Sequence, residues 1–206
     1  MTNDRSLRER LVDAGVDLVL AGGTSLVGLR EIARRAGVSH GAPRRYFPTH
    51  DSLLSAIARR GFEDLEARFV TATADATTPR AQLEAAARAY VGYALEHRGM
   101  FELMFRHDLL DGAPQAAGGP RLRETSLPLF GRIVELVTRC RAEDETAPPA
   151  AVTAAALWSN LHGVVQLWSW GSLQVVLGAD VPGDEAVRRE QLVSAVLSAH
   201  LGPVPG

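Results

Sequence analysis

The segment 36–47, AGVSHGAPRRYF, combines side chains that suit phosphate and base recognition. Arg44 and Arg45 are adjacent, and each guanidinium presents a planar fork of N–H donors that matches a phosphate or the acceptor edge of guanine. Tyr46 follows with a hydroxyl that can donate to a phosphate oxygen. Small residues precede the arginines, so the backbone can approach a ligand closely. This segment therefore predicts contact with nucleic acid.

Two short helices joined by a turn are needed to position these side chains. The first is predicted near 29–35, after Gly28 as N-cap, with Ile32 and Ala33 facing inward and Arg30 outward. Gly37 permits a sharp turn. The second helix is predicted to begin at the N-cap Ser39 and to end near Tyr46, before Pro48. A helix-turn-helix of this kind can place its second helix in the major groove.

Pro43 fits this prediction least well. With Ser39 as N-cap, Pro43 is the fourth helical residue, where its missing N–H loses a hydrogen bond to the Ser39 carbonyl. We therefore expect a short or 3₁₀-like first turn.

The charge distribution is consistent with a DNA-binding N-terminal segment but does not prove DNA binding. Residues 1–60 contain ten arginines and six acidic residues, whereas residues 61–206 contain twelve and eighteen. The same pattern fits a solvated surface helix carrying arginines. The order of elements favours the helix-turn-helix, because a helix capped by Thr49 and running to about Thr73 follows immediately.

Composition limits the class of protein. With 206 residues, 46% hydrophobic and 22% charged, the chain matches an ordinary soluble globular protein. The N-terminus lacks the pattern of a secretory signal, and the longest uncharged runs are broken by polar residues, so we expect a cytoplasmic protein. Cys140 is the single cysteine, which excludes an internal disulfide and a cysteine-clustered zinc site.

Helical periodicity continues along the rest of the chain. Helices are expected at 7–22, from 79 onward, at 122–141, at about 149–172, and over a last stretch bearing Val187, Leu192, Val196 and Leu201. The segment 111–120 is expected to be a loop. LQVVL at 173–177 is the nearest approach to a strand and is too short to change the prediction. The fold class is therefore all-α.

These residues resemble the TetR-type bacterial transcriptional repressors. The signature is Ile32-Ala33, Ala36 to Ser39, Gly41 and Tyr46-Phe47-Pro48 followed by THDSLL, and the similarity covers about residues 5–60. Segments 90–105 and 157–168 also resemble the C-terminal domain of a subgroup named for its Trp-His-Gly motif, with Trp158, His162 and Gly163 at the matching positions. The resemblance implies about nine helices, with an N-terminal three-helix helix-turn-helix DNA-binding domain (1–50) and a C-terminal helical ligand-binding and dimerisation domain (51–206).

The chain departs from the family pattern at several positions that contact DNA in the family. Pro43 and Arg44 replace the usual leucine and tyrosine, His50 replaces a lysine, and Gly28 replaces a threonine cap. The phosphate contact that this tyrosine makes in the family must therefore be made here by Arg44 or Tyr46. The operator sequence of this chain cannot be inferred from the family. The predicted DNA-binding residues are Gly28, Arg30, Ser39, His40, Gly41, Ala42, Arg44, Arg45, Tyr46 and His50.

The resemblance also implies a homodimer and a small-molecule site in the C-terminal domain. The last two long helices are expected to form a four-helix dimer bundle through Leu161, Val165, Trp168, Leu192, Val196 and Leu201. Methionine and aromatic side chains suit the lining of a pocket for an apolar ligand. Both sets equally fit an ordinary intramolecular core. The predicted ligand-binding residues are Tyr90, Phe101, Met104, Phe105, Phe130, Trp158 and His162.

The function predicted is that of a repressor bound to a palindromic operator of double-stranded DNA and released by a small apolar ligand. A helical module that binds only protein is the alternative, and an enzyme is a weaker one. His97, Glu102, His107 and Asp108 lack metal-ligand spacing, and no nucleophile, phosphate-loop or dinucleotide motif is present. No catalytic residue, metal or cofactor is therefore expected. The operator, the inducer and the regulated genes are not specified by the sequence.

Overall fold

Every element of secondary structure that the computed structural model describes is a helix. The structure describes residues 6–23, 27–106, 109, 121–141, 148–178 and 181–203. Over these residues the chain forms ten helices and no strand, which confirms the all-α prediction. In the same part of the chain, no helix is long and apolar enough to cross a membrane. The loop predicted at 111–120 lies outside the described residues.

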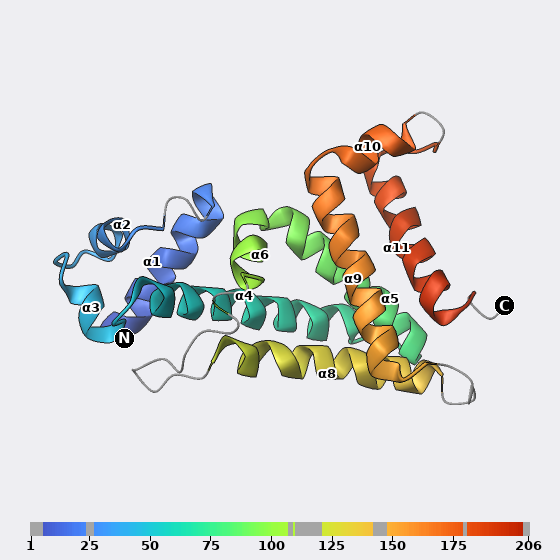
Figure 1. The fold of residues 1–206 in the computed structure, drawn as a ribbon, viewed down its shortest axis with the longest axis horizontal. Helices are drawn as coiled ribbons and strands as arrows, with labels where there is room; N and C mark the ends of the chain where they lie inside the picture. The colour runs from blue at the N-terminus through green and yellow to red at the C-terminus, as the bar shows by residue number, and fades with distance from the viewer. Residues whose placement is uncertain are drawn as a thin grey trace. The chain divides into compact units, whose positions relative to one another are not determined.

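The chain divides into two compact units, each built from segments that are distant in sequence. Unit 1 comprises residues 1–64 and 96–127, and unit 2 comprises residues 65–95 and 128–206. Two helices contribute residues to both units, namely α4 (His50–Thr73) and α8 (Leu122–Cys140) (Figure 1).

Unit 1 begins with α1 (Leu7–Gly22), which starts at a capping box. The Ser6 hydroxyl accepts from the Glu9 backbone N–H at 3.3 Å, and the Glu9 carboxylate accepts from the Ser6 backbone N–H at 3.0 Å. The helix ends at the predicted Gly22-Gly23 stop. Its buried residues are Leu11, Val12, Ala14, Gly15, Leu18 and Val19.

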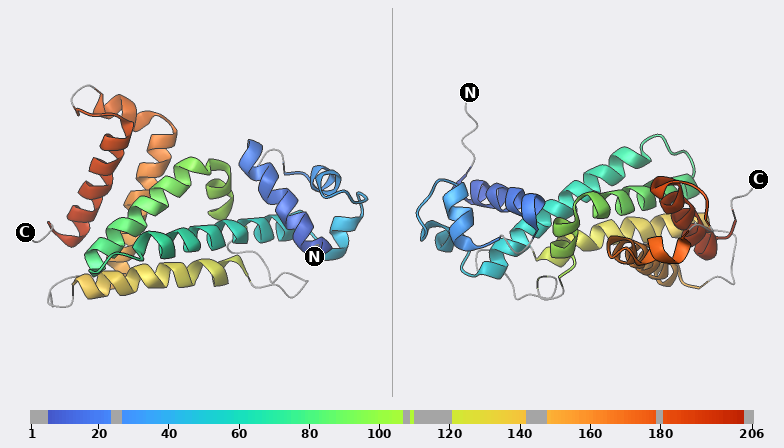
Figure 2. Two further views of the ribbon diagram at one scale, coloured as in Figure 1. Left: turned by 180° about the vertical axis from the view of Figure 1, so that it is seen from behind. Right: turned by 90° about the horizontal axis from the view of Figure 1, so that it is seen from above.

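Two short helices pack against α1 and against each other. They are α2 (Leu29–Arg35) and α3 (Ala42–Tyr46), and Figure 2 shows both beside α1. Next in the chain, α4 is capped as predicted, because the Thr49 hydroxyl accepts from the Ser52 backbone N–H at 3.0 Å. Asp51 lies in the first turn of α4, where its charge favours the helix dipole.

Unit 1 is completed by α6 (Arg98–Met104), which packs against α1. The approach is close because Gly99 has no side chain: a Cβ there would lie 2.7 Å from the Gly23 Cα and 3.0 Å from the Val19 carbonyl oxygen. Glycine is therefore required at 99 for α6 to dock against the end of α1.

Unit 2 is organised around α9 (Ala150–Ser169), which packs against α10 (Ser172–Leu177) and α11 (Glu185–Leu201) (Figure 2). Near the end of α5 (Pro79–Glu96), Tyr90 and Tyr93 are buried. Arg141, directly after α8, donates 2.7 Å hydrogen bonds to the Thr153 hydroxyl and to the His200 carbonyl. The Arg141 guanidinium thus connects the C-terminal end of α8 with the first turn of α9 and the last turn of α11.

The single helix predicted at about 149–172 is wrong at its C-terminal end. α9 ends at Ser169, and Gly171 adopts φ +79°, a left-handed conformation that favours glycine and interrupts the helix. The chain then resumes as α10, which contains the LQVVL segment.

Replacing Gly99 by alanine should destabilise unit 1. The new methyl group would meet backbone atoms that can move only if α6 moves, so we expect the free energy of unfolding to fall by about 1–3 kcal/mol. Urea unfolding followed by circular dichroism measures the change. Gly92→Ala on α5 is the matched control, because a Cβ there meets nothing within 4 Å; it should raise stability by up to about 1 kcal/mol. Equal effects of the two substitutions would contradict this packing.

Candidate functional site

The turn between α2 and α3 has a defined geometry. Gly37 adopts φ +68°, its N–H donates to the Arg34 carbonyl at 3.1 Å, and the Val38 N–H donates to the Ala33 carbonyl at 3.0 Å. Arg10 of α1 then donates through Nη2 to the Ala36 carbonyl at 2.7 Å. The predicted role of Gly37 is confirmed, and Arg10 ties the turn to α1.

The predicted start of the second helix is wrong. α3 begins at Ala42 with Gly41 as N-cap, and the Ser39 carbonyl accepts from the Ala42 N–H at 3.0 Å. Pro43 is therefore the second helical residue rather than the fourth. A proline at this position loses nothing, because the first N–H groups of a helix have no intrahelical acceptor. The shorter helix removes the conflict that Pro43 posed.

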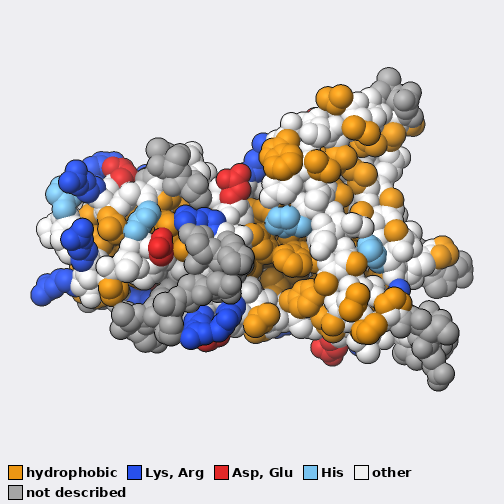
Figure 3. All heavy atoms as spheres, in the orientation of Figure 1, with side chains coloured by type: hydrophobic (Ala, Val, Ile, Leu, Met, Phe, Trp, Pro, Cys, Tyr) orange, Lys and Arg blue, Asp and Glu red, His pale blue; other side chains and the backbone are white. Residues whose placement is uncertain are grey.

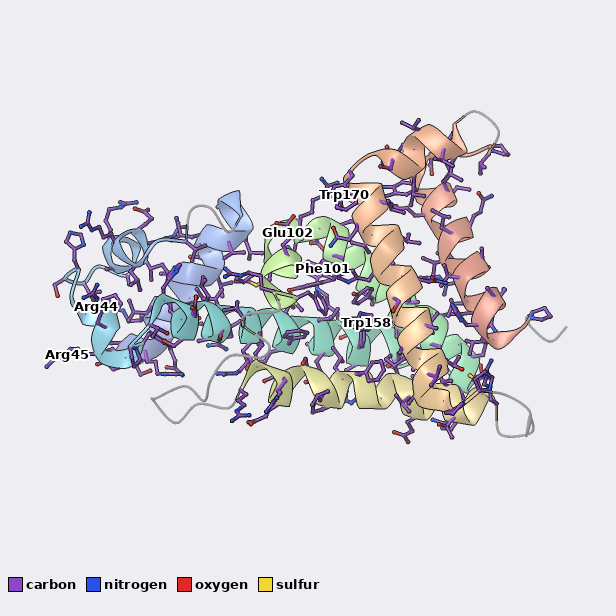
Figure 4. All side chains as sticks on the ribbon, in the orientation of Figure 1. Arg44, Arg45, Phe101, Glu102, Trp158 and Trp170 are labelled. Carbon is purple, nitrogen blue, oxygen red and sulfur yellow. The ribbon has the colours of Figure 1, made fainter. Side chains whose placement is uncertain are left out.

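The inner side of α3 is apolar and its outer side is cationic. Pro43 is buried, and Phe47, directly after the helix, is 1% exposed. The Arg8 guanidinium carbon lies 5.1 Å from the centre of the Phe47 ring, which adds a cation–π contact from α1. Arg44 and Arg45 are exposed and project away from the ribbon (Figure 4).

Beside α3 lies an open hollow with a volume of about 620 Å³. Arginine side chains gather on this part of unit 1, around α2 and α3 (Figure 3). The hollow brings together residues from the start of α2, from α3 and from the start of α4. Its lining residues are Gly28, Leu29, Arg30, His40, Gly41, Arg44 and His50.

The arginines of this region fall into two groups. Arg34 donates through Nε to the Glu31 carboxylate at 2.8 Å, and Arg35 lies 3.7 Å from Asp17. The hydrogen bond from Arg34 lowers the pKa of Glu31. Within the described residues, no carboxylate pairs with Arg30, Arg44 or Arg45. The guanidinium groups at the hollow and on α3 are thus available to an anion.

His50 has a structural partner that the sequence did not reveal. Its Nε2 lies 2.7 Å from the Val27 carbonyl oxygen, so this nitrogen carries the proton and donates. The hydrogen bond links the start of α4 to the residues that precede α2. The predicted DNA-contact role of His50 stays a prediction, and any such contact must use the other side of its ring.

The remaining predicted DNA-binding residues belong to the turn and to α3. Ser39, His40 and Gly41 are exposed in the turn, while Ala42 and Tyr46 are half-buried in α3. A slim helix with small residues at its leading end and two outward cations fits the dimensions and charge of a DNA groove.

The predicted ligand-binding residues divide between the units. In unit 1, Phe101 and Met104 are buried, and Phe105 packs against Phe62 and Phe101 with ring centres 5.5 and 4.8 Å apart. Tyr90, Phe130, Trp158 and His162 belong to unit 2.

Three of the four residues in unit 2 are joined by hydrogen bonds, and Phe130 packs against one of them. Trp158 Nε1 donates to the Tyr90 hydroxyl at 2.9 Å, and that hydroxyl lies 2.9 Å from His162 Nδ1. Gln166 lies one helical turn further, 3.4 Å from His162 Nε2. Burial raises the pKa of Tyr90 and lowers that of His162. Phe130 packs edge-on against Trp158, with ring centres 6.2 Å apart.

The residues predicted at the dimer interface have mixed positions. Leu161, Val165 and Trp168 of α9 lie in the core of unit 2, so the structure gives these side chains an intramolecular role. On α11, Val193 and Leu197 are buried, which leaves Leu192, Val196 and Leu201 only half-buried. The helix thus carries two neighbouring apolar stripes, and the dimer-interface role of Leu192, Val196 and Leu201 stays a prediction.

Several large apolar side chains of unit 2 are exposed instead. Trp170 is 71% exposed, and Val175 and Val176 of α10 are 82% and 76% exposed. Figure 3 shows hydrophobic side chains on the surface of α9 and α10. A cluster of this kind on a folded protein commonly marks an interaction surface.

The described part of the chain contains no group of three potential metal ligands. Two of the four possible metal ligands considered in the sequence analysis, His107 and Asp108, lie outside the described residues.

Taken together, the docked α2–turn–α3 unit and its outward arginines define a helix-turn-helix DNA-binding module. A family model described as bacterial regulatory proteins, tetR family, matches residues 11–57, and one described as the tetracyclin repressor-like C-terminal domain matches residues 83–191. The second match covers more than half of the chain, so this chain belongs to the TetR family of DNA-binding transcriptional regulators. The family is not enzymatic, which confirms the prediction that the chain is not an enzyme.

Among curated relatives, the chain is similar to the HTH-type transcriptional repressor KstR of Mycolicibacterium smegmatis, at 30% identity over 53% of this chain and 66% of the relative. It is 39% identical to KstR of Rhodococcus jostii over 30% of this chain and 29% of that protein. The chain thus matches less than two thirds of the length of each relative. A solved structure of a Rhodococcus sp. RHA1 protein of unknown function shares 27% identity, with a TM-score of 0.75 over 97% of this chain and 96% of that one.

Sequence reasoning missed two residues that organise these sites. Arg10 has no motif that marks it, because its acceptor is a backbone carbonyl 26 residues away. Gln166 was detectable, since it lies four residues after His162 on a predicted helix, where side chains become neighbours.

Replacing His50 by alanine should destabilise the segment that leads into α2. The Val27 carbonyl would lose its donor, so we expect the free energy of unfolding to fall by about 1 kcal/mol, measured by urea unfolding. His40→Ala is the matched control, because His40 is an exposed histidine of the same hollow; its effect should stay within about 0.5 kcal/mol. A His50→Ala protein as stable as His40→Ala would show that this hydrogen bond does not support the module.

Proposed function

We propose that this protein is a cytoplasmic transcriptional repressor that binds a palindromic operator as a homodimer and is released by a small apolar ligand. The observation that carries the proposal is α3, a slim docked helix whose Arg44 and Arg45 are exposed and have no carboxylate partner among the described residues. Its similarity to repressors over part of their length supports repression rather than activation.

The proposed DNA contacts follow from the position of each group. Arg44 and Arg45 contact phosphates or guanine edges, and Tyr46 donates to a phosphate. Arg30 and His50 line the hollow beside α3 and contact the same stretch of the DNA backbone. The leading end of α3, which approaches the bases, is formed by Ser39, His40, Gly41 and Ala42. Gly28 offers a backbone amide. The functional division proposed is a DNA-binding domain at 1–50 and a ligand-binding and dimerisation domain at 51–206.

Dimerisation is proposed through the outward faces of α9, α10 and α11. The half-buried Leu192, Val196 and Leu201 contribute from α11, and the exposed Trp170 contributes from the end of α9. Two copies of one reading helix, about 34–36 Å apart, would match the two halves of a palindrome.

The ligand is proposed to contact the cluster of Tyr90, Phe130, Trp158 and His162, which combines aromatic surface with a few polar groups. For Phe101, Met104 and Phe105 a ligand contact stays a prediction. Binding would release the operator if the ligand prefers a conformation with another position of α4. Trp158, His162 and Gly163 also support assignment to the Trp-His-Gly subgroup.

Arg44→Ala and Arg45→Ala should each weaken binding to a 30-base-pair duplex and reduce its salt dependence. Each lost phosphate contact should lower the slope of log K against log salt by about 0.9. Fluorescence anisotropy between 50 and 300 mM salt measures the slope. Arg132→Ala, which removes an exposed arginine paired with Glu66 in unit 2, is the charge-matched control and should leave the slope unchanged. If all three variants behave like the wild type, α3 is not the DNA-reading element.

Trp170→Glu should convert the proposed dimer into monomer. The substitution places a charge in an apolar interface and removes a large buried surface there, so we expect the dimer dissociation constant to rise at least tenfold, or about 1.4 kcal/mol. Sedimentation velocity measures the change. Val70→Glu, at another apolar side chain that is 55% exposed, is the control and should remain dimeric. A monomeric wild type, or an unchanged Trp170→Glu dimer, would contradict the proposed surface.

A further inference from the structure

One hydrogen bond fixes which nitrogen of His50 carries the proton. His50 Nε2 lies 2.7 Å from the backbone carbonyl oxygen of Val27. A carbonyl oxygen can only accept, so Nε2 is the donor. A neutral imidazole has a single N–H, and the Nδ1 of neutral His50 is therefore bare and offers a lone pair. Within the part of the chain that the structure describes, the bond to Val27 is the only hydrogen bond of this side chain.

The open hollow beside α3 places His50 among groups that attract phosphate. Arg30 of α2 and Arg44 of α3 line the hollow together with His50, and His40 lines it from the turn. Histidine and arginine side chains are seen together on this part of unit 1 (Figure 3). Among the described lining residues there is no carboxylate. The nearest acidic residue on α4 is Asp51, which follows His50 and is exposed in the first turn.

A phosphate oxygen and a bare imidazole nitrogen cannot bond to each other, because both only accept. A DNA phosphate in the hollow can therefore contact His50 directly only if Nδ1 also carries a proton. His50 is then an imidazolium that donates from Nε2 to the Val27 carbonyl and from Nδ1 to the phosphate. A hydrogen bond between two ionised groups is stronger than a neutral one, and the phosphate charge itself favours the imidazolium.

We infer that His50 contacts a DNA phosphate as an imidazolium through its Nδ1–H, and that DNA binding therefore takes up a proton from solvent at this residue of each protomer. Because the complex holds more protons than the free protein, its affinity rises as the pH falls. An imidazole changes its charge between pH 5 and 8, which is the range where the effect appears. The inference rests on the proposed function, since it specifies how pH regulates that same DNA-binding surface.

Binding to the 30-base-pair duplex between pH 8.5 and pH 6.0, at constant salt, tests the proton uptake by fluorescence anisotropy. We expect the wild-type affinity per protomer to rise about five- to tenfold toward pH 6.0, as one charge-assisted hydrogen bond allows. In His50→Gln the rise should shrink to about twofold or less, because the amide still donates to the Val27 carbonyl but carries no titrating charge.

Two further variants complete the comparison. His50→Lys is charged over the whole range, so it should bind about equally tightly at both pH values. His200→Gln removes a histidine of α11 in unit 2, outside the hollow, and should keep the full wild-type rise.

A second measurement reads His50 in the wild-type protein. Its imidazole ¹H and ¹⁵N signals, assigned by comparison with His50→Gln, are followed against pH in the free protein and in the DNA complex. We expect the midpoint of the His50 titration to rise by about one pH unit when DNA binds, as a tenfold effect requires. An unchanged midpoint, or a bare Nδ1 in the saturated complex at pH 6.0, would overturn the inference.

The failure of this inference can be told apart from failure of the proposed function. Salt-dependent DNA binding with the same pH dependence in wild type and His50→Gln would overturn the inference alone. A rise that is lost in His40→Gln but kept in His50→Gln would assign the proton to the turn and would also overturn it. No binding of the wild type at pH 6.0 and 50 mM salt would overturn the DNA-binding function together with the inference.

Discussion

The anchoring of α3 by its apolar side is the constraint on which the DNA-binding function depends. A five-residue helix has little stability of its own, because helix nucleation is costly and few intrahelical bonds follow it. Burial of Pro43 and Phe47 holds α3 against α1 and α2, and Arg8 covers the Phe47 ring. Because these groups fix the inner side, Arg44 and Arg45 can only face outward. The position of the cations is thus a consequence of the buried aromatic next to them.

The sequence was a good guide wherever one local signal dominated. Thr49 and the Gly22-Gly23 pair mark helix ends through their own chemistry, and the structure places those ends where expected. Apolar spacing predicted the buried Ile32 and Ala33 in the same way. The all-α class and the family follow from these local patterns together with the residues of the turn.

The errors arose where two local signals competed. Ser39 and Gly41 can both precede a helix, and Pro43 decides between them, since proline is tolerated only in the first turn. On α11 two apolar stripes are adjacent, and the sequence alone does not say that Val193 and Leu197 form the one that packs in the core. Contacts with distant acceptors, such as that of Arg10 with the Ala36 carbonyl, leave no pattern in the sequence.

The central claim is that the two arginines of α3 meet the duplex while the paired arginines of the same region do not. The most direct measurement is the ¹⁵N NMR spectrum of the arginine Nε–H groups during titration with duplex DNA at low salt. The account predicts that the Arg44 and Arg45 signals shift strongly, whereas the signal of Arg34, held by Glu31, moves little. Unmoved Arg44 and Arg45 signals at saturating DNA, with shifts confined to other arginines, would contradict it.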